Sequence, residues 1–242
     1  MKIVIATPFY DHKGHSPYID SLLQSTKFLS AAGIEWEFMS LSGDTFIDRA
    51  RNTLAARFLE GDGTHLLFID SDMSWDVVGF AHLIGADVDL VGGVYPMKNK
   101  WNDYVARLHC TADGRPIQRN GLLSAEWAAT GFLKISRKVF ETMAPSLKDR
   151  QYKDAGADPR SPDRIYTPYF EFTSGGGVRC GEDITFSHRW TALGGEVWIE
   201  PRVSFDHWGQ TPFRGNYHEF LLKQPQPGEA SRVPVSILEL AA

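Results

Sequence analysis

The sequence has few cysteines, no long apolar run and little excess charge, and each absence excludes a class of protein. Its 242 residues include 2 cysteines, Cys110 and Cys180, which lie far apart and lack neighbours at metal-ligand spacing. This predicts free thiols in a reducing compartment, by default the cytoplasm, rather than a disulfide or zinc framework. No apolar run approaches the roughly 18 to 20 residues that cross a bilayer, so no membrane span is expected.

The charge balance gives no general support for nucleic-acid binding. A formal net charge of −5 does not attract a phosphate backbone, although a local basic patch remains compatible with it. Hydrophobic residues make up 43% and charged residues 23%, which predicts an ordinary folded protein, and the length predicts one domain. The apolar part of MKIVIATPFYD is too short for a signal peptide and predicts a first strand.

Strand-like and helix-like segments alternate along the first part of the chain. The expected strands cover residues 2–7, 35–41, 64–70 and 88–95, and the expected helices cover 16–33, 47–61 and 75–85. Apolar strands separated by amphipathic helices predict an α/β fold with a largely parallel sheet covered on both faces.

The second part of the chain is less regular. A hairpin is expected around Asp113-Gly114, a short helix capped by Ser136 after it, and a long functional or mobile loop over 149–177. Further strands are expected at 130–135 and 196–201, and a further helix at 181–195.

Two aspartates follow the apolar strand in LLFIDSDMSW. Asp70 and Asp72 stand at i and i+2 on an extended segment, so both side chains leave the same face of the chain. The carboxyl end of a parallel strand is where open α/β sheets bind ligands, and paired carboxylates suit Mg²⁺ or Mn²⁺. An isolated Asp-x-Asp is equally explained if Asp72 caps the helix that follows.

Five short motifs then occur in an informative order. They are Thr7-Pro8, FIDSD at 68–72, TGF at 130–132, GED at 181–183 and FDHWG at 205–209. From Lys2 to Arg214 this order resembles that of GT-A-fold nucleotide-sugar glycosyltransferases, and the chain looks related to family 2. The resemblance implies a GT-A-like, Rossmann-like three-layer α/β sandwich with a mixed, mainly parallel central sheet. It further implies one domain over residues 1–222, with a donor half near 1–100 and an acceptor half near 101–222.

The resemblance also implies a metal site for the donor diphosphate, with Mn²⁺ or Mg²⁺ as cofactor. It assigns Asp72 to the cation, Asp70 to the ribose or the cation, and His207 to the cation as a third ligand. Without the resemblance, a lone histidine beside an aromatic residue is more often a structural hydrogen bonder. Asp206 is either a partner of this ligand or a turn residue.

Further residues are expected around the nucleoside diphosphate. The donor-binding candidates are Thr7, Pro8, Tyr10, Arg49, Arg51, Asn52, Asp70, Ser71 and Arg214. Arginines on a helix such as the one in DRARN usually point at solvent, and Arg214 is equally explained as an exposed residue without a ligand.

The GED motif supplies the candidate catalytic acids. By resemblance, Asp183 is the general base of an inverting transfer and Glu182 positions the acceptor. Two carboxylates at a helix N-terminus are also favoured by the helix dipole alone. Trp127, Thr130 and Gly131 are the acceptor-binding candidates, although an aromatic residue such as Trp127 is more often part of the core.

The expected partner is a nucleoside-diphosphate sugar, and the acceptor is open. A saccharide is favoured, and hydroxymethylated DNA of the kind that viral glycosyltransferases modify is the alternative. The residues that suggest DNA are the basic ones near 149–179: Arg150, Lys153, Arg160, Arg164 and Arg179. The proline-rich tail at 223–242 is expected to pack on the domain or to form a homo-oligomer with a second subunit.

Two other functional classes compete with a transferase. A dinucleotide-binding oxidoreductase shares the alternating pattern, but TPFYDHKGHS after the first strand contains no G-x-G-x-x-G. A non-catalytic nucleotide-sugar or carbohydrate-binding module on the same fold stays open, because fold does not determine function.

Overall fold

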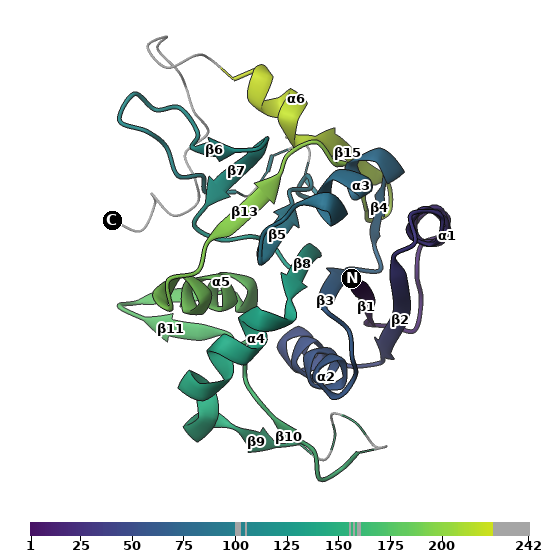
Figure 1. Cartoon of the computed structure of the whole chain (residues 1–242), viewed down its shortest axis with the longest axis vertical. Coiled ribbons are helices and arrows are strands. Elements are labelled where there is room, and N and C mark those ends of the chain that lie inside the picture. The colour runs from purple at the N-terminus through teal and green to yellow at the C-terminus, as the bar shows by residue number, and fades with distance from the viewer. Residues whose placement is uncertain (100–102, 105, 155, 157, 159–160, 225–242) are drawn as a thin grey trace.

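A mixed eight-stranded sheet forms the centre of the protein (Figure 1). The structure is a computed structural model that describes residues 1–99, 103–104, 106–154, 156, 158 and 161–224. The strand order is β2-β1-β3-β8-β5-β13-β7-β6, in which β8 and β7 run opposite to the other strands. The strands are β1 (Lys2–Phe9), β2 (Glu35–Ser42), β3 (His65–Ile69), β5 (Leu90–Gly93), β6 (Gln118–Arg119), β7 (Leu122–Ala125), β8 (Phe132–Ser136) and β13 (Val197–Glu200).

Helices cover both faces of this sheet. One face carries α1 (Ser16–Ala31) and α3 (Val77–Gly85), and the other carries α2 (Ile47–Glu60), α4 (Arg137–Met143) and α5 (Glu182–Ala192) (Figure 1). A 3₁₀ helix, η1 (Ala144–Arg150), continues α4. The predicted α/β three-layer sandwich with a mixed central sheet is therefore confirmed.

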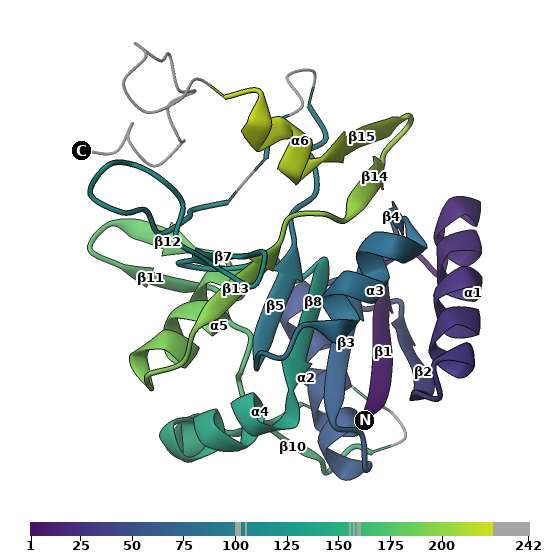
Figure 2. The ribbon, with the colours of Figure 1, turned by 45° about the horizontal axis from the view of Figure 1, so that its top comes forward.

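A smaller sheet stands at the carboxyl ends of the central strands (Figure 2). It has the order β15-β14-β4 and consists of β4 (Met73–Trp75), β14 (Ser204–Trp208) and β15 (Pro212–Asn216), followed by α6 (Tyr217–Leu222). Two peripheral hairpin-like pairs join β9 (Tyr152–Lys153) to β10 (Ile165–Tyr166) and β11 (Thr173–Gly175) to β12 (Val178–Cys180). Residues 152–153, 165–166 and 173–175 of the predicted 149–177 loop thus belong to short strands.

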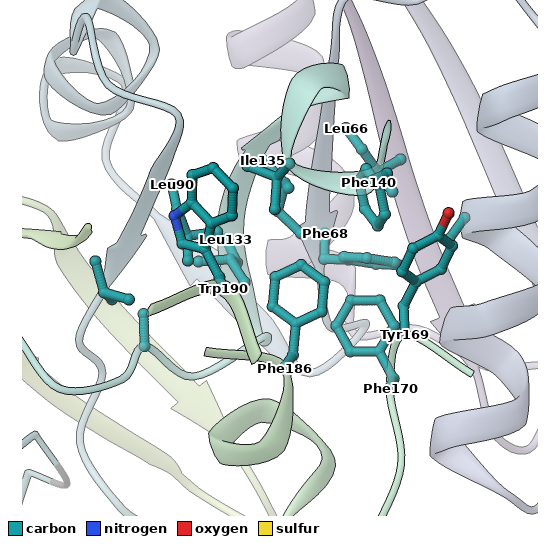
Figure 3. Close-up of a cluster of buried hydrophobic side chains, with 14 of the residues drawn as sticks. Leu66, Phe68, Leu90, Leu133, Ile135, Phe140, Tyr169, Phe170, Phe186 and Trp190 are labelled. Carbon is teal, nitrogen blue, oxygen red and sulfur yellow. The ribbon is translucent and has the colours of Figure 1, made fainter. Parts of the chain in front are cut away.

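Alternating side chains of the central strands build two apolar layers. On β1, Val4 packs with the layer beneath α2, α4 and α5, whereas Ile3 and Ile5 pack with the layer beneath α1 and α3. In the first layer the rings of Phe170 and Phe186 stack with centroids 4.4 Å apart (Figure 3). Fully burying such a side chain contributes about 1.5 to 3 kcal/mol to the stability of the fold, so these two layers stabilise the packing of the helices on the sheet.

Several local predictions need correction. The expected helix at 75–85 begins later, at Val77, because Met73–Trp75 form β4 and Asp76 caps the helix by accepting from the Gly79 amide. Asp72 is therefore not the helix cap. Ser136 precedes α4 without capping it, because its hydroxyl donates to Asp89 instead.

The remaining predictions concern the turn, the tail and the membrane. The turn at Asp113-Gly114 is present, with the Thr111 amide bonded to the Arg115 carbonyl at 2.8 Å and Gly114 at φ 80°. Residues 225–242 of the predicted tail and Arg160 of the basic group lie outside the described residues. Among the helices that the structure describes, none has the length and apolar character that crossing a membrane requires.

Candidate active site

The candidate site lies at the edge where β1, β3 and β5 end and β8 begins. Asp70 and Asp72 follow β3 as predicted, and the Asp70 amide donates to the Gly131 carbonyl at the start of β8, at 3.0 Å. A cleft of about 180 Å³ opens beside these aspartates. Its lining consists of Pro8, Tyr10, Asp44, Thr45, Ile47, Asp70, Ser71 and Asp72. Four of the predicted donor-binding residues, Pro8, Tyr10, Asp70 and Ser71, thus share one cleft.

Arg51 joins the two acidic parts of the site. Its side chain is 3% exposed, with Nη2 3.0 Å from Asp70 Oδ1 and Nε 3.2 Å from Glu182 Oε1. The third nitrogen, Nη1, is buried without a hydrogen-bond partner among the described residues. Arg51 does not point at solvent, because α2 places it beneath the cleft between carboxylates from β3 and α5.

Asp72 lies beside Lys98 and His207 rather than beside Arg51. Its Oδ2 lies 2.5 Å from Lys98 Nζ and 3.6 Å from His207 Nε2, while its Oδ1 is buried without a partner in the described part of the chain. Burial alone would raise the pKa of Asp72, but the contacts with His207 and Lys98 outweigh burial and lower it to about 2. Asp72 is therefore an anion throughout the neutral range.

The backbone holds His207 next to Asp72. His207 pairs with Met73 between β14 and β4, and the Trp208 amide donates to the Asp72 carbonyl at 2.7 Å. The His207 Nδ1 lies 2.9 Å from the Pro96 carbonyl oxygen, which can only accept, so Nδ1 carries the proton. Nε2 then faces Asp72, where the protonated ring places an N–H against the carboxylate and the neutral ring places a free lone pair that a cation can use.

This donor set was compared with what a divalent cation requires. Among the described residues no three His, Cys, Asp or Glu side chains are arranged as a metal cage. Asp72, with one partnerless buried oxygen, and His207 nevertheless offer two ligands, while Asp70 is engaged by Arg51. Mg²⁺-type sites commonly use one or two protein ligands and complete the shell with substrate phosphates and water. The residues therefore fit a cation that binds together with a diphosphate.

Glu182 and Asp183 form the second acidic part of the site, at the start of α5. Glu182 is held by Arg51 and by the Thr130 hydroxyl, which donates to Oε1 at 3.2 Å. Asp183 has no such cationic partner, and its Oδ1 accepts only the adjacent Ile184 amide in the described part of the chain. Burial, followed by the charge of Glu182, raises the pKa of Asp183 to about 6.

Other predicted residues lie in structural hydrogen bonds. The buried Thr7 hydroxyl bonds the Tyr18 hydroxyl at 2.6 Å, and Asn52 exchanges two hydrogen bonds with the Phe170 backbone. Trp127 is buried. Arg49 makes a bidentate pair with Asp44, a residue of the cleft wall.

Arg214 and the basic loop residues are largely engaged by acids. Arg214 lies on β15 with Nε 3.4 Å from Asp206. Near the loop, the ion pairs are Arg150–Glu171, Lys153–Asp163 and Arg164 with Glu60 and Asp158. Arg179 stacks over Phe172. Among the described basic residues of this segment, the ion pairs of Arg150, Lys153 and Arg164 reduce the positive charge that is available to a nucleic-acid backbone.

The sequence reasoning missed Tyr95 and Lys98. Tyr95 closes the apolar run VDLVGGVY and therefore looked like a strand residue, although β5 ends at Gly93. Lys98 stands in a segment without periodicity, and only the folded chain brings it to Asp72. The only feature of the sequence that could have identified Tyr95 as a site residue was its place at the end of a predicted strand, because polar groups beyond strand ends often belong to ligand-binding sites.

Comparisons with known proteins identify similar folds. No protein-family model and no curated protein matches the chain. The crystal structure of A197 from STIV is similar, with a TM-score of 0.52, 19% identity and 86% of each chain covered.

Two further similar structures cover unequal shares of the chains. GalNAc-T7 with UDP, GalNAc and Mn²⁺ has a TM-score of 0.48 and 13% identity over 84% of this chain and 43% of that one. The catalytic domain of Drosophila β1,4-galactosyltransferase 7 with xylobiose has a TM-score of 0.46 and 14% identity over 96% and 76%. At such identities the likeness is one of fold. The predicted fold class, a three-layer α/β sandwich with a mixed central sheet, is confirmed by the sheet and helices described above, and the relation to family 2 stays a prediction.

Proposed function

We propose that this protein is a glycosyltransferase that moves a sugar from a nucleoside-diphosphate donor to an acceptor hydroxyl with inversion, with Mn²⁺ or Mg²⁺ as cofactor. One observation carries the proposal: buried Arg51 separates two acidic parts of the site with opposite electrostatic character. Asp72 faces cationic groups beside the cleft, and Asp183 is a carboxylate whose pKa is raised to about 6. The order of the sequence motifs on this fold class supports the same assignment.

On the donor side, Asp72 and His207 would hold the cation. The chemistry that a bound cation supplies is neutralisation of the charge that develops on the leaving diphosphate. Lys98 is a second positive group within reach of the same charge, because its amine already lies against Asp72. Pro8, Tyr10 and Ser71 line the adjacent cleft and would contact the nucleoside.

On the acceptor side, Asp183 acts as the general base. It takes the proton of the acceptor hydroxyl while that oxygen forms a bond to the anomeric carbon, and the bond from this carbon to the phosphate oxygen breaks. The nucleoside diphosphate leaves with the electron pair, and attack from the opposite face inverts the anomeric configuration. A base with a pKa near 6 is ionised at neutral pH and still basic enough to assist.

Arg51 and Thr130 position these groups. Because Arg51 bonds both Asp70 and Glu182, it fixes the donor edge of β3 against the N-terminus of α5. Thr130 adds a second bond to Glu182, and burial together with the charge of Glu182 keeps the pKa of the neighbouring Asp183 high. Neither residue needs to touch the reacting atoms.

The competing functions differ in what they require. A non-catalytic binding module needs no isolated base, so the environment of Asp183 favours an enzyme. DNA as acceptor would require free basic groups, whereas three of the described basic residues near 149–179, Arg150, Lys153 and Arg164, are paired with acids, so a saccharide acceptor is favoured. The tail, the domain halves and the cytoplasmic location stay predictions.

Binding of nucleoside diphosphates tests this proposal first. UDP and GDP, each with and without Mn²⁺, should raise the midpoint of thermal unfolding only in the metal-containing pair that matches the donor base. Asp72→Ala should abolish this shift, while Asp20→Asn, an exposed change on α1, should leave it intact. Radiolabelled sugar nucleotides then report turnover, and proton NMR of the product reports its anomeric configuration. Absence of any metal-dependent shift and of any turnover would overturn the proposal, and a retained configuration would overturn inversion.

A further inference from the structure

Tyr95 is a substantially buried residue of the site that the mechanism above does not use. It stands two positions beyond the end of β5, at the same edge of the sheet as Asp70. Its ring packs edge-on against Phe205 and His207, with centroids 5.9 and 5.0 Å apart. Within the described part of the chain, its hydroxyl has no hydrogen-bond partner. A fixed ring with an unused hydroxyl is a ready contact for a ligand.

The hydroxyl points to the narrow space beside Gly131. A Cβ atom built on Gly131 would overlap the Tyr95 hydroxyl and would lie 3.0 Å from Asp70 Oδ2. The backbone of Gly131 does not have a positive φ, so glycine is required here for space and not for conformation. The absent side chain of Gly131 thus brings the Tyr95 hydroxyl and the Asp70 carboxylate toward one point.

We propose that the Tyr95 hydroxyl donates a hydrogen bond to a hydroxyl of the transferred sugar, and that Tyr95 and Gly131 together determine which donor sugar is accepted. The inference rests on the proposed function. The sugar must lie between the diphosphate, held near Asp72 and His207, and the acceptor oxygen, held near Asp183. Tyr95 packs against His207, and its hydroxyl lies beside Gly131, whose neighbour Thr130 bonds Glu182 next to Asp183, so the hydroxyl faces that interval.

The conservative variant Tyr95→Phe tests this contact. The assay measures hydrolysis of the donor in the absence of an acceptor by detecting the nucleoside diphosphate that is released. The donors are UDP-glucose, UDP-galactose, UDP-GlcNAc and GDP-mannose. For the preferred sugar, kcat/KM should fall roughly 3- to 10-fold, which is the range for one neutral hydrogen bond. The discrimination between that sugar and its epimers should shrink by the same factor. Binding of UDP or GDP alone with Mn²⁺ should stay unchanged, because these ligands lack the sugar.

Two further variants distinguish the contact from general damage. Tyr217→Phe removes a hydroxyl from a buried tyrosine on α6 and should leave both kcat/KM and sugar preference unchanged. Gly131→Ala should displace the Tyr95 hydroxyl and alter the sugar preference at least as much as Tyr95→Phe. Thermal unfolding of each variant shows whether it is folded, and Tyr95→Phe remains decisive if Gly131→Ala does not fold.

The possible outcomes distinguish failure of the proposed role of Tyr95 from failure of the proposed glycosyltransferase function. Wild-type protein that binds a nucleoside diphosphate and cleaves its sugar, with Tyr95→Phe equal to it in rate and sugar ranking, overturns the role of Tyr95 alone. An effect of Tyr95→Phe confined to the KM for an acceptor overturns it as well. Wild-type protein without any binding or turnover overturns the proposed function, and the inference with it.

Discussion

The two acidic pairs of the site, Asp70 with Asp72 and Glu182 with Asp183, share a plan but differ in electrostatics. In each pair one carboxylate is bound by Arg51, and the other is not. Asp72 is surrounded by Lys98 and His207, and its pKa falls to about 2, whereas burial beside Glu182 raises that of Asp183 to about 6. In the proposed function, the same residue type would hold a cation in one place and accept a proton in the other.

The largest expected effect comes from a variant that removes only the proposed proton acceptor, Asp183. Asp183→Asn keeps nearly the same shape but cannot take a proton, so turnover should fall by roughly a hundred- to ten-thousand-fold. Metal-dependent affinity for UDP or GDP should remain close to wild type, because Asp183 does not contact the donor cleft. Steady-state kinetics and calorimetric titration check the two halves of this prediction. Full turnover in Asp183→Asn would transfer the role of base to Glu182.

The second effect removes the residue that the two pairs share. Arg51→Met leaves Asp70 and Glu182 as buried carboxylates without their cation, and breaking a buried ion pair costs about 3 to 5 kcal/mol of unfolding free energy. Urea denaturation followed by circular dichroism measures this loss. Lys138→Met, which breaks an exposed pair with Asp89, is the matched control and should cost at most about 1 kcal/mol. Equal losses in both variants would contradict the structural importance of Arg51.

The third effect is a pH dependence that belongs to one pair only. As the proposed base, Asp183 must be ionised to act, and its pKa is raised to about 6, so kcat/KM should be constant above that value and fall as pH drops through it. At pH 5 about a tenth of the neutral rate should remain. Stopped assays from pH 5 to 8 measure the profile, with circular dichroism to confirm that the protein stays folded. A rate that rises toward acid pH would be inconsistent with a carboxylate base.

The last two variants test the proposed cation-binding side of the site. His207→Ala removes one proposed ligand and should weaken Mn²⁺-dependent UDP or GDP binding by roughly 10- to 100-fold, a range typical of disturbed metal sites. Lys98→Met removes a cation that competes for Asp72, so binding of Mn²⁺ alone should tighten by a few-fold. Titration of the Mn²⁺ electron paramagnetic resonance signal reports both changes. Unchanged affinity in both variants would remove the proposed metal ligands.

The strand ends could be predicted from the sequence because they depend on local pattern. The apolar run before Asp70 gave a buried strand, and a carboxylate after such a strand must lie at the edge of the sheet. The direction of each strand could not be predicted from local pattern in the same way. The run FLKI has no feature that distinguishes parallel from antiparallel pairing, and β8 runs against both of its neighbours.

The contacts of the site could not be predicted because they join distant positions. Arg51 and Glu182 are separated by 131 residues along the chain, and no local rule distinguishes an arginine that points at solvent from one beneath a cleft. Tyr95 was missed for a related reason. A tyrosine that ends an apolar run has the pattern of a core residue, and only the fold shows that its hydroxyl lacks a partner in the described chain.

The pairing of β4 with β14 has a consequence for how the site is completed. Because Met73 and His207 are register partners, Asp72 meets His207 only when the strand near the end of the chain docks beside β4. A chain that lacks β14 would contain only half of the proposed metal site. If the proposed cation binds there, its affinity is thermodynamically linked to closure of the small sheet, and the bound cation would stabilise the pairing of β14 with β4.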